Sequence, residues 1–143
     1  MSNMIAGPSS LGVLIVEDAS VVRRIVIMTL REMPELSGAT IDEAESGKVA
    51  FQKLRGRTYH LIISEVQVHG IDGLALVRHV REELQDLRTP ILLICRLEDD
   101  AGSEAGLAAG ASGFVPKPLS PHRIKRAVQR ILRREPTGTS KAG

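Results

Sequence analysis

Acidic residues end two short apolar runs of this sequence. The run at residues 61–63 is followed closely by Glu65, and the run at 11–16 is followed by Glu17 and Asp18. Short, continuous apolar runs are typical of strands that are buried on both faces of a parallel sheet. Because ligands bind beyond the carboxyl ends of such strands, the sequence predicts that the three carboxylates share one pocket.

A thiol and an ammonium group come with two further runs. Cys95 ends the apolar run 91–95, and Lys117 follows the shorter stretch 112–115. Three carboxylates beside one lysine repel one another and raise the pKa of at least one carboxyl group, which favours a bound Mg²⁺. The alternative is an acidic pocket without a metal. For Cys95, a small buried core residue is favoured over a redox sensor, because no residue nearby in the sequence would activate the thiol.

The segments between these runs carry helix signals. Ser20, Ser46, Asp72 and Ser120 are suitable N-caps, and Pro121 suits a first helical position. Helices are expected at about 21–33, 47–56, 73–84, after 98–100 and from 121 onward, with a further weak strand at 39–43. Strands that alternate with helices five times predict an α/β fold, a (βα)5 doubly wound parallel five-stranded sheet with helices on both faces.

Helical spacing also predicts which side chains face the core. Arg23 lies largely off the inner face of the first helix, whereas Leu84 and Leu132 are predicted to face inward in the third and last helices. The fourth helix is the weakest prediction, because Gly102 and Gly106 each cost it about 1 kcal/mol relative to alanine.

Length and composition fit one globular domain. The chain has 143 residues, 43% hydrophobic and 25% charged, so we expect a domain over 11–134, a flexible N-terminus at 1–10 and a disordered tail at 135–143. Aromatic residues make up only 2%, which argues against base stacking on single-stranded nucleic acid. The single cysteine permits no internal disulfide, and neither a signal peptide nor an apolar run of membrane length is present. A cytoplasmic protein without membrane contact is therefore expected.

Basic residues gather late in the chain, although the formal net charge is only +2. From residue 123 onward Glu135 is the single acid, and the basic residues include Arg123, Lys125, Arg126 and Arg130. One interpretation is a solvated helix face. The other is a docking surface for an acidic partner.

Four segments resemble the receiver domain of two-component response regulators, most closely the single-domain chemotaxis type. They are residues 13–18, 22–26, 65–73 and 110–118, which come in order on the expected strand ends. The resemblance covers about 11–134 and implies the flavodoxin-like receiver fold. It also implies the family chemistry, in which an aspartate at the end of the third strand takes a phosphoryl group from a histidine kinase. Mg²⁺, a lysine and a Ser or Thr hydroxyl assist that transfer.

Part of this apparatus is present in the sequence. Lys117 matches the family lysine, and the Lys117–Pro118 bond stands where the family often has a cis peptide, whose isomer the sequence leaves open. Phe114 matches the switch aromatic, although it has no phenol hydroxyl. The resemblance implies that a weak Mg²⁺ site would use the acidic pair, the acceptor position and one backbone carbonyl, here Glu17, Asp18, Glu65 and Gln67.

Two departures predict the loss of phosphotransfer. Glu65 stands where the family has its acceptor aspartate. Its extra methylene moves the carboxylate by roughly 1.5 Å, and a displacement of this size can slow an in-line attack by about a hundredfold. Cys95 stands at the switch hydroxyl, for which a thiol is a weak substitute. Glu65 would instead act as a fixed, partial mimic of the phosphorylated state, because a carboxylate has about one charge and a phosphoryl group nearly two.

We therefore expect a stand-alone, phosphorylation-independent signalling protein that binds a protein partner and is not an enzyme. By resemblance, the partner surface comprises the fourth helix, the last strand and the last helix, and a histidine kinase is one candidate partner. The first alternative is a conventional response regulator in which Glu65 still accepts phosphate. The second is nucleic-acid binding through the basic last helix, which the absence of a groove-reading motif disfavours.

Overall fold

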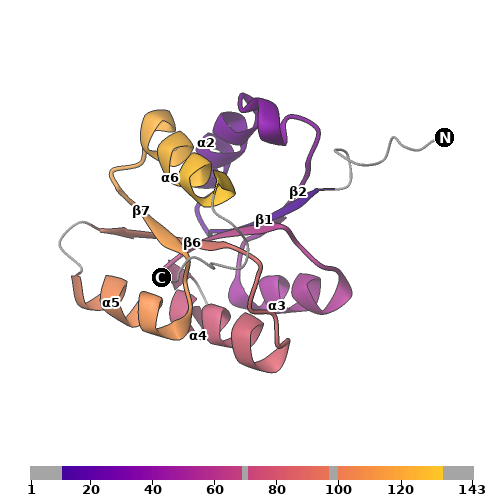
Figure 1. Cartoon of the computed structure of the whole chain (residues 1–143), viewed down its shortest axis with the longest axis vertical. Coiled ribbons are helices and arrows are strands. Elements are labelled where there is room, and N and C mark those ends of the chain that lie inside the picture. Colours follow the sequence, from indigo (N-terminus) through magenta and orange to yellow (C-terminus); the bar gives the residue numbers. More distant parts are fainter. Residues whose placement is uncertain (1–10, 69–70, 97–99, 134–143) are drawn as a thin grey trace.

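Five parallel strands form one sheet in the computed structural model, which describes residues 11–68, 71–96 and 100–133 (Figure 1). The strands are β1 (Gly12–Val16), β2 (Thr40–Ala44), β3 (Leu61–Glu65), β6 (Ile91–Arg96) and β7 (Gly113–Lys117). Their order in the sheet is β2-β1-β3-β6-β7, and every neighbouring pair is parallel. The flexible segments predicted at 1–10 and 135–143 lie outside the described residues.

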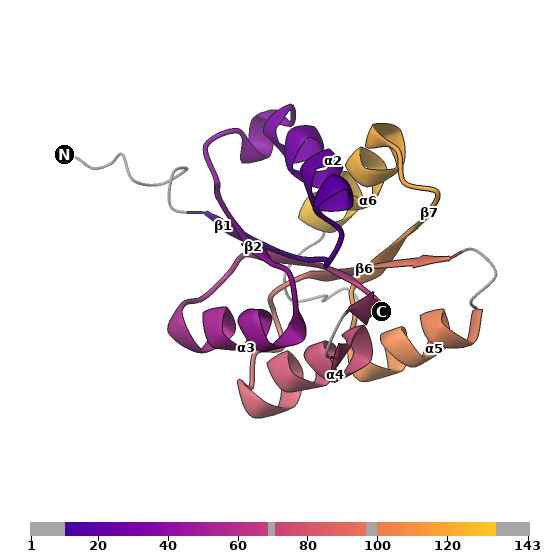
Figure 2. The same ribbon diagram turned by 180° about the vertical axis from the view of Figure 1, so that it is seen from behind.

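Helices cover both faces of this sheet (Figures 1 and 2). One face carries α2 (Ser20–Arg31) and α6 (Pro121–Arg133), and the other carries α3 (Gly47–Gly56), α4 (Gly73–Arg78) and α5 (Asp100–Ala109). A 3₁₀ turn, η2 (Pro34–Leu36), follows α2, and α4 continues as the π-helical segment η3 (His79–Glu83). None of the helices in the described part of the chain is long and apolar enough to cross a membrane. The predicted doubly wound α/β fold is confirmed.

The sheet divides the aliphatic core into two clusters. Side chains alternate along a strand, so Ile63 and Ile94 face α2 and α6, whereas Ile62 and Leu93 face α3, α4 and α5. All four side chains are almost completely buried. This explains why the central strands are continuous apolar runs, since both of their faces are covered.

The strand order determines where a ligand site can form. The chain runs from β1 outward to β2 and then crosses back to β3, so the direction of winding reverses between β1 and β3. Because all five strands are parallel, their carboxyl ends lie at one edge of the sheet. Glu17 after β1, Glu65 at the end of β3 and Lys117 at the end of β7 are thus brought to the same edge.

The predicted helix caps are confirmed at two positions and wrong at one. The hydroxyl groups of Ser46 and Ser120 each accept a backbone N–H three residues further on, at 3.3 and 3.2 Å. Ser20 is instead the first residue of α2, and the N-cap is Ala19, which has no side-chain hydrogen bond. The prediction for Asp72 concerns a side chain outside the described set.

Two predictions of side-chain orientation are wrong. Arg23 is not part of the apolar core beneath its helix, yet its side chain is only 14% exposed, because it reaches back toward the strand ends. Leu84 is exposed because it follows η3, whose wider turn changes the helical spacing. Leu132 is also exposed, since it lies beside the buried stripe of α6 that contains Val128 and Ile131.

A short hairpin that the sequence did not predict follows β3. Its strands are β4 (Gln67–Val68) and β5 (Ile71–Asp72), which pair in antiparallel orientation directly before α4. A Cβ atom at Gly73 would lie 2.7 Å from the carbonyl oxygen of Glu65. Only glycine therefore allows the start of α4 to pack this closely on the end of β3.

Candidate functional site

The side chains of Glu65 and Lys117 form an ion pair at the carboxyl edge of the sheet. Glu65 is the last residue of β3 and Lys117 the last residue of β7, with β6 between them. The distance from Lys117 Nζ to Glu65 Oε1 is 2.9 Å, and the side chains are 36% and 9% exposed, respectively. A carboxylate this deeply buried needs such a partner to remain an anion. Lys117 thus neutralises Glu65 itself.

Glu17 is buried next to this ion pair. Its backbone N–H donates to the carbonyl of Ala44 at 3.0 Å, and one carboxyl oxygen accepts the N–H of Ala19 at 3.0 Å. Burial raises the pKa of Glu17 to about 7. The nearby side chains of Asp18 and Glu65 also raise this pKa, whereas the hydrogen bond from Ala19 lowers it. Near neutral pH the pocket therefore carries less negative charge than its three carboxyl groups suggest.

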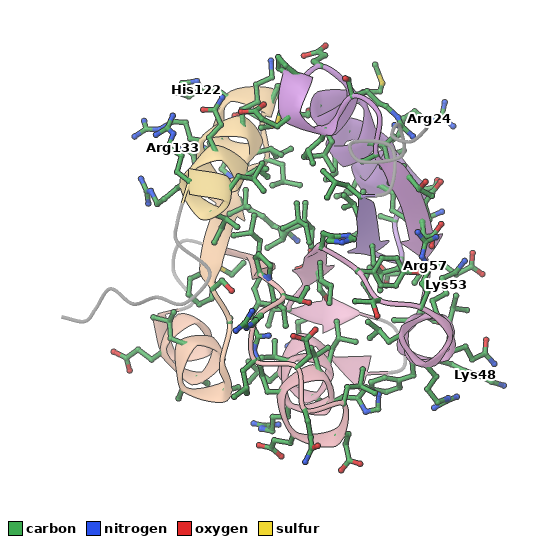
Figure 3. All side chains as sticks on the ribbon, turned by 45° about the vertical axis from the view of Figure 1, so that its right-hand side comes forward. Arg24, Lys48, Lys53, Arg57, His122 and Arg133 are labelled. Atoms are coloured by element: carbon green, nitrogen blue, oxygen red, sulfur yellow. The ribbon has the colours of Figure 1, made fainter. Side chains whose placement is uncertain are left out.

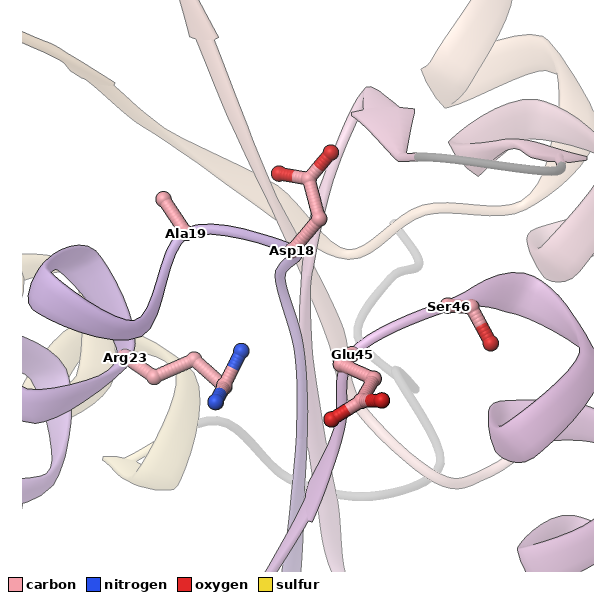
Figure 4. A pocket seen from close by; sticks show the side chains of 5 residues that line it. All are labelled: Asp18, Ala19, Arg23, Glu45 and Ser46. Carbon is pink, nitrogen blue, oxygen red and sulfur yellow. The ribbon is translucent and has the colours of Figure 1, made fainter.

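Asp18 lies at the mouth of the site. It is exposed, and together with Arg23, Glu45 and Ser46 it lines an open surface pocket of about 520 Å³ beyond the ends of β1 and β2 (Figure 4). In this view the carboxylate of Asp18 points away from the guanidinium of Arg23. Of the predicted acidic trio, two members are thus buried and one is open to solvent.

The fourth predicted metal ligand, the backbone carbonyl of Gln67, belongs to the hairpin that follows β3. Gln67 pairs with Asp72 in this hairpin, and its side chain is exposed. Its role as a ligand stays a prediction.

The acidic side chains do not fit a preformed Mg²⁺ site. Carboxylate oxygens are the ligands that Mg²⁺ prefers, but Glu65 is engaged by Lys117 and Glu17 holds a proton up to about pH 7. Within residues 11–68, 71–96 and 100–133, no group of three or more His, Cys, Asp or Glu side chains is arranged to hold a metal ion. A cation would have to displace that proton and compete with Lys117.

Of the two predicted switch residues, Cys95 lies in the core on the face covered by α3, α4 and α5, and the partly buried Phe114 packs against that core. Cys95 is 5% exposed and belongs to the core cluster against which Phe114 packs. The ring of Phe114 is directed toward α5, since a Cβ atom at Gly106 would lie 3.2 Å from it. The structure therefore brings Glu17, Glu65 and Lys117 together at the carboxyl edge of the sheet. Cys95 and Phe114 lie on the face of the sheet that α3, α4 and α5 cover.

Arg23 is a site residue that the sequence did not indicate. Its Nη1 group donates to the carbonyl oxygen of Glu17 at 2.7 Å, and its Nε group donates to Glu43 Oε1 at 2.8 Å. The one signal in the sequence is its position in the first turn of the helix that follows the acidic pair, from which a long side chain can reach back.

Comparison with known proteins agrees with this architecture. The family model for the response regulator receiver domain matches residues 13–129. The transcriptional regulatory protein ResD of Bacillus subtilis is 33% identical over 122 residues, which are 85% of this chain and 48% of ResD. The response regulator ArlR of Staphylococcus saprophyticus is 31% identical over 87% of this chain and 53% of its own length. The chain thus spans about half the length of these two relatives.

Solved structures give the same result. The chemotaxis response regulator CheY4 of Vibrio cholerae superimposes with a TM-score of 0.76 at 30% identity, over 85% of this chain and 98% of that one. The signal receiver domain of a histidine kinase from Syntrophus aciditrophicus gives a TM-score of 0.73 at 26% identity, over 94% and 96% of the two chains. With the family model covering most of the sequence, this chain belongs to the response regulator receiver domain family.

Proposed function

We propose that this receiver domain signals without phosphorylation, by binding a protein partner while Glu65 holds the acceptor position. Receiver domains commonly bind Mg²⁺ at the acidic site and interact with histidine kinases or other signalling proteins. The observation that carries the proposal is the ion pair of 2.9 Å between Glu65 and Lys117. In this pair the carboxylate takes up the charge that would otherwise stabilise an incoming phosphoryl group.

The geometry of a phosphoryl transfer supports the proposal. The nucleophilic oxygen must approach the phosphorus in line while a lysine and a metal ion neutralise the other oxygens. In this pocket the longer side chain of Glu65 reaches Lys117 directly. The same contact leaves both groups without a free role in that reaction.

A weak Mg²⁺ interaction is part of the proposal. Glu17 and Asp18 offer oxygen ligands, yet binding must remove a proton from Glu17 and weaken the ion pair of Glu65. Millimolar Mg²⁺ should consequently change the pocket little at neutral pH, and the protein should act by binding rather than catalysis.

The proposed partner surface lies over α5, β7 and α6. Arg126 and Arg130 are exposed on α6, and Leu107 is exposed on α5. Lys125 is paired with Glu32 at 3.0 Å, so it offers less charge to a partner than Arg126 and Arg130 do. An acidic protein surface with an apolar contact fits this combination. We place this interaction in the cytoplasm, which suits a sequence with a single cysteine.

Capture of the partner from the native cell tests the proposal. Wild-type protein should retain the partner without a phosphodonor, and Arg126→Glu with Arg130→Glu should lose it. Lys48→Glu with Arg55→Glu is the matched control, because it reverses two exposed charges on α3, on the opposite face of the sheet. Figure 3 shows Lys48 on that side of the molecule. Capture by the wild type only after treatment with a phosphodonor would instead support a conventional response regulator.

A further inference from the structure

Arg23 connects the turn that carries Glu17 and Asp18 to β2, the edge strand of the sheet. From the first turn of α2 its side chain runs toward the ends of β1 and β2 (Figure 4). Its Nη1 group donates to the carbonyl oxygen of Glu17, and its Nε group to the carboxylate of Glu43 on β2. Its own backbone N–H donates to the carbonyl of Ala19 at 3.0 Å. One residue thus binds the turn on both sides of Asp18 and the neighbouring strand.

These contacts complete the immobilisation of Glu17. The N–H of Glu17 is bonded to β2, its carboxyl group accepts from Ala19, and its carbonyl accepts from Arg23. Without Arg23, the carbonyl oxygen would lose a charge-assisted hydrogen bond of 2.7 Å. The turn between β1 and α2 would then keep only the hydrogen bonds to Ala44 and from Ala19, and we expect the carboxyl groups of Glu17 and Asp18 to shift with it.

A surface salt bridge does not account for these observations. An exposed ion pair contributes about 0–1 kcal/mol, and Glu43 is indeed 48% exposed. The side chain of Arg23, however, is 14% exposed, and its shorter hydrogen bond goes to the backbone of the acidic residue. Its neighbour Arg24 is exposed on the same helix (Figure 3).

We infer that Arg23 is a positioning residue that fixes Glu17 and Asp18 against Glu65, and that the chemistry of the pocket depends on it. This inference rests on the proposed function, in which the acceptor position determines whether the pocket can take a phosphoryl group. It assigns Arg23 no contact with a reacting atom. Its effect passes through the backbone of Glu17.

The test compares Arg23→Met with the matched control Arg24→Met in a Glu65→Asp background. With acetyl phosphate and Mg²⁺, a carboxylate oxygen of the new aspartate attacks phosphorus, the bond from phosphorus to the acetyl oxygen breaks, and acetate leaves. Arg23→Met should lower the rate of this phosphorylation about 10- to 100-fold at saturating donor, because the carboxyl groups of Glu17 and Asp18 are displaced. Arg23→Lys, which can make only one of the two contacts well, should fall between, and Arg24→Met should be within about twofold of its parent.

A second readout separates failure of this inference from failure of the proposed function. In the wild-type background, at a temperature where both variants are folded, Arg23→Met should shift the amide NMR signals of Asp18, Ala19 and Glu65, and Arg24→Met should not. Equal phosphorylation rates for both methionine variants, or equal amide spectra in this region, would overturn the role of Arg23. If Glu65→Asp accepts no phosphate, the proposed function fails and the NMR comparison alone decides on Arg23.

Discussion

The ammonium group of Lys117 lies 2.9 Å from the carboxylate of Glu65, and β6 separates the strands that carry them. The ion pair therefore spans the carboxyl end of β6, a central strand. Because the carboxylate is much more buried than the lysine, removal of the lysine leaves a desolvated anion, whereas removal of both charges does not.

Lys117→Met should therefore destabilise the protein by about 1–3 kcal/mol at pH 8. Addition of Glu65→Gln to this variant should restore most of that loss, since no unpaired charge then remains. Lys125→Met is the control, because Lys125 makes an exposed ion pair with Glu32, and it should cost under about 0.5 kcal/mol. Urea denaturation of the wild type, both single pocket variants (Lys117→Met and Glu65→Gln), the double variant and Lys125→Met measures these differences. Additive effects of the two pocket substitutions would contradict the coupling.

The buried carboxyl group of Glu17 makes stability depend on pH. Its pKa is raised from the ordinary value of 4.5 to about 7, mainly by burial, so the folded state binds more protons than the unfolded state between these values. The free energy of unfolding should decrease as pH rises through this window, by roughly 1–3 kcal/mol in total. Glu17→Gln should remove this dependence. Denaturation midpoints from pH 4.5 to 8 test it, and an unchanged slope in the variant would rule out Glu17 as the cause.

Arg81 joins two loops at the amino edge of the sheet. Its guanidinium donates to the carbonyl oxygens of Gly110 at 3.0 Å and Asp86 at 2.9 Å, and burial lowers its pKa. Arg81→Met should cost about 1–3 kcal/mol, because two carbonyl groups lose a charged donor. Arg78→Met, at an exposed position of α4, should change stability by less than about 0.5 kcal/mol. Thermal unfolding compares the two variants, and similar melting temperatures would show that the hydrogen bonds of Arg81 do not stabilise the fold.

Gly106 allows α5 to pack closely on the sheet. A Cβ atom there would lie 2.8 Å from Leu93 and 3.2 Å from the ring of Phe114. Gly106→Ala should destabilise the protein by about 1–3 kcal/mol despite its better helix propensity. Gly56→Ala in α3 meets no atom within 4 Å and should be neutral or slightly stabilising. A gain in stability at Gly106 would show that propensity outweighs packing at this position.

The sequence was sufficient for most of the fold, because strand and helix signals agree along the chain. Continuous apolar runs predict β1, β3 and β6, whose strands are central and covered on both faces. Periodicity predicts the buried stripe of α6, and serine caps predict where α3 and α6 begin. The hairpin of β4 and β5 was missed because two-residue strands have no periodicity to detect.

The sequence predicts most residues of the site but only some of the contacts between them. Parallel strands bring their ends to one edge, so the meeting of Glu17, Glu65 and Lys117 follows from topology. The role of Arg23 does not follow, since helical spacing describes where a side chain starts and not how far it reaches. From the sequence, Gly106 could be judged only by its low helix propensity. Its close contacts with β6 and β7 depend on tertiary packing.

The most direct test of the account is intact-mass measurement of the wild-type protein and Glu65→Asp after incubation with acetyl phosphate and Mg²⁺. No phosphoryl adduct is expected on the wild type. Glu65→Asp, whose shorter carboxylate frees Lys117, should gain one adduct that maps to residue 65. Glu45→Asp makes the same chemical change at an exposed position and should gain none. A stoichiometric adduct on Glu65 of the wild-type protein would contradict phosphorylation-independent signalling.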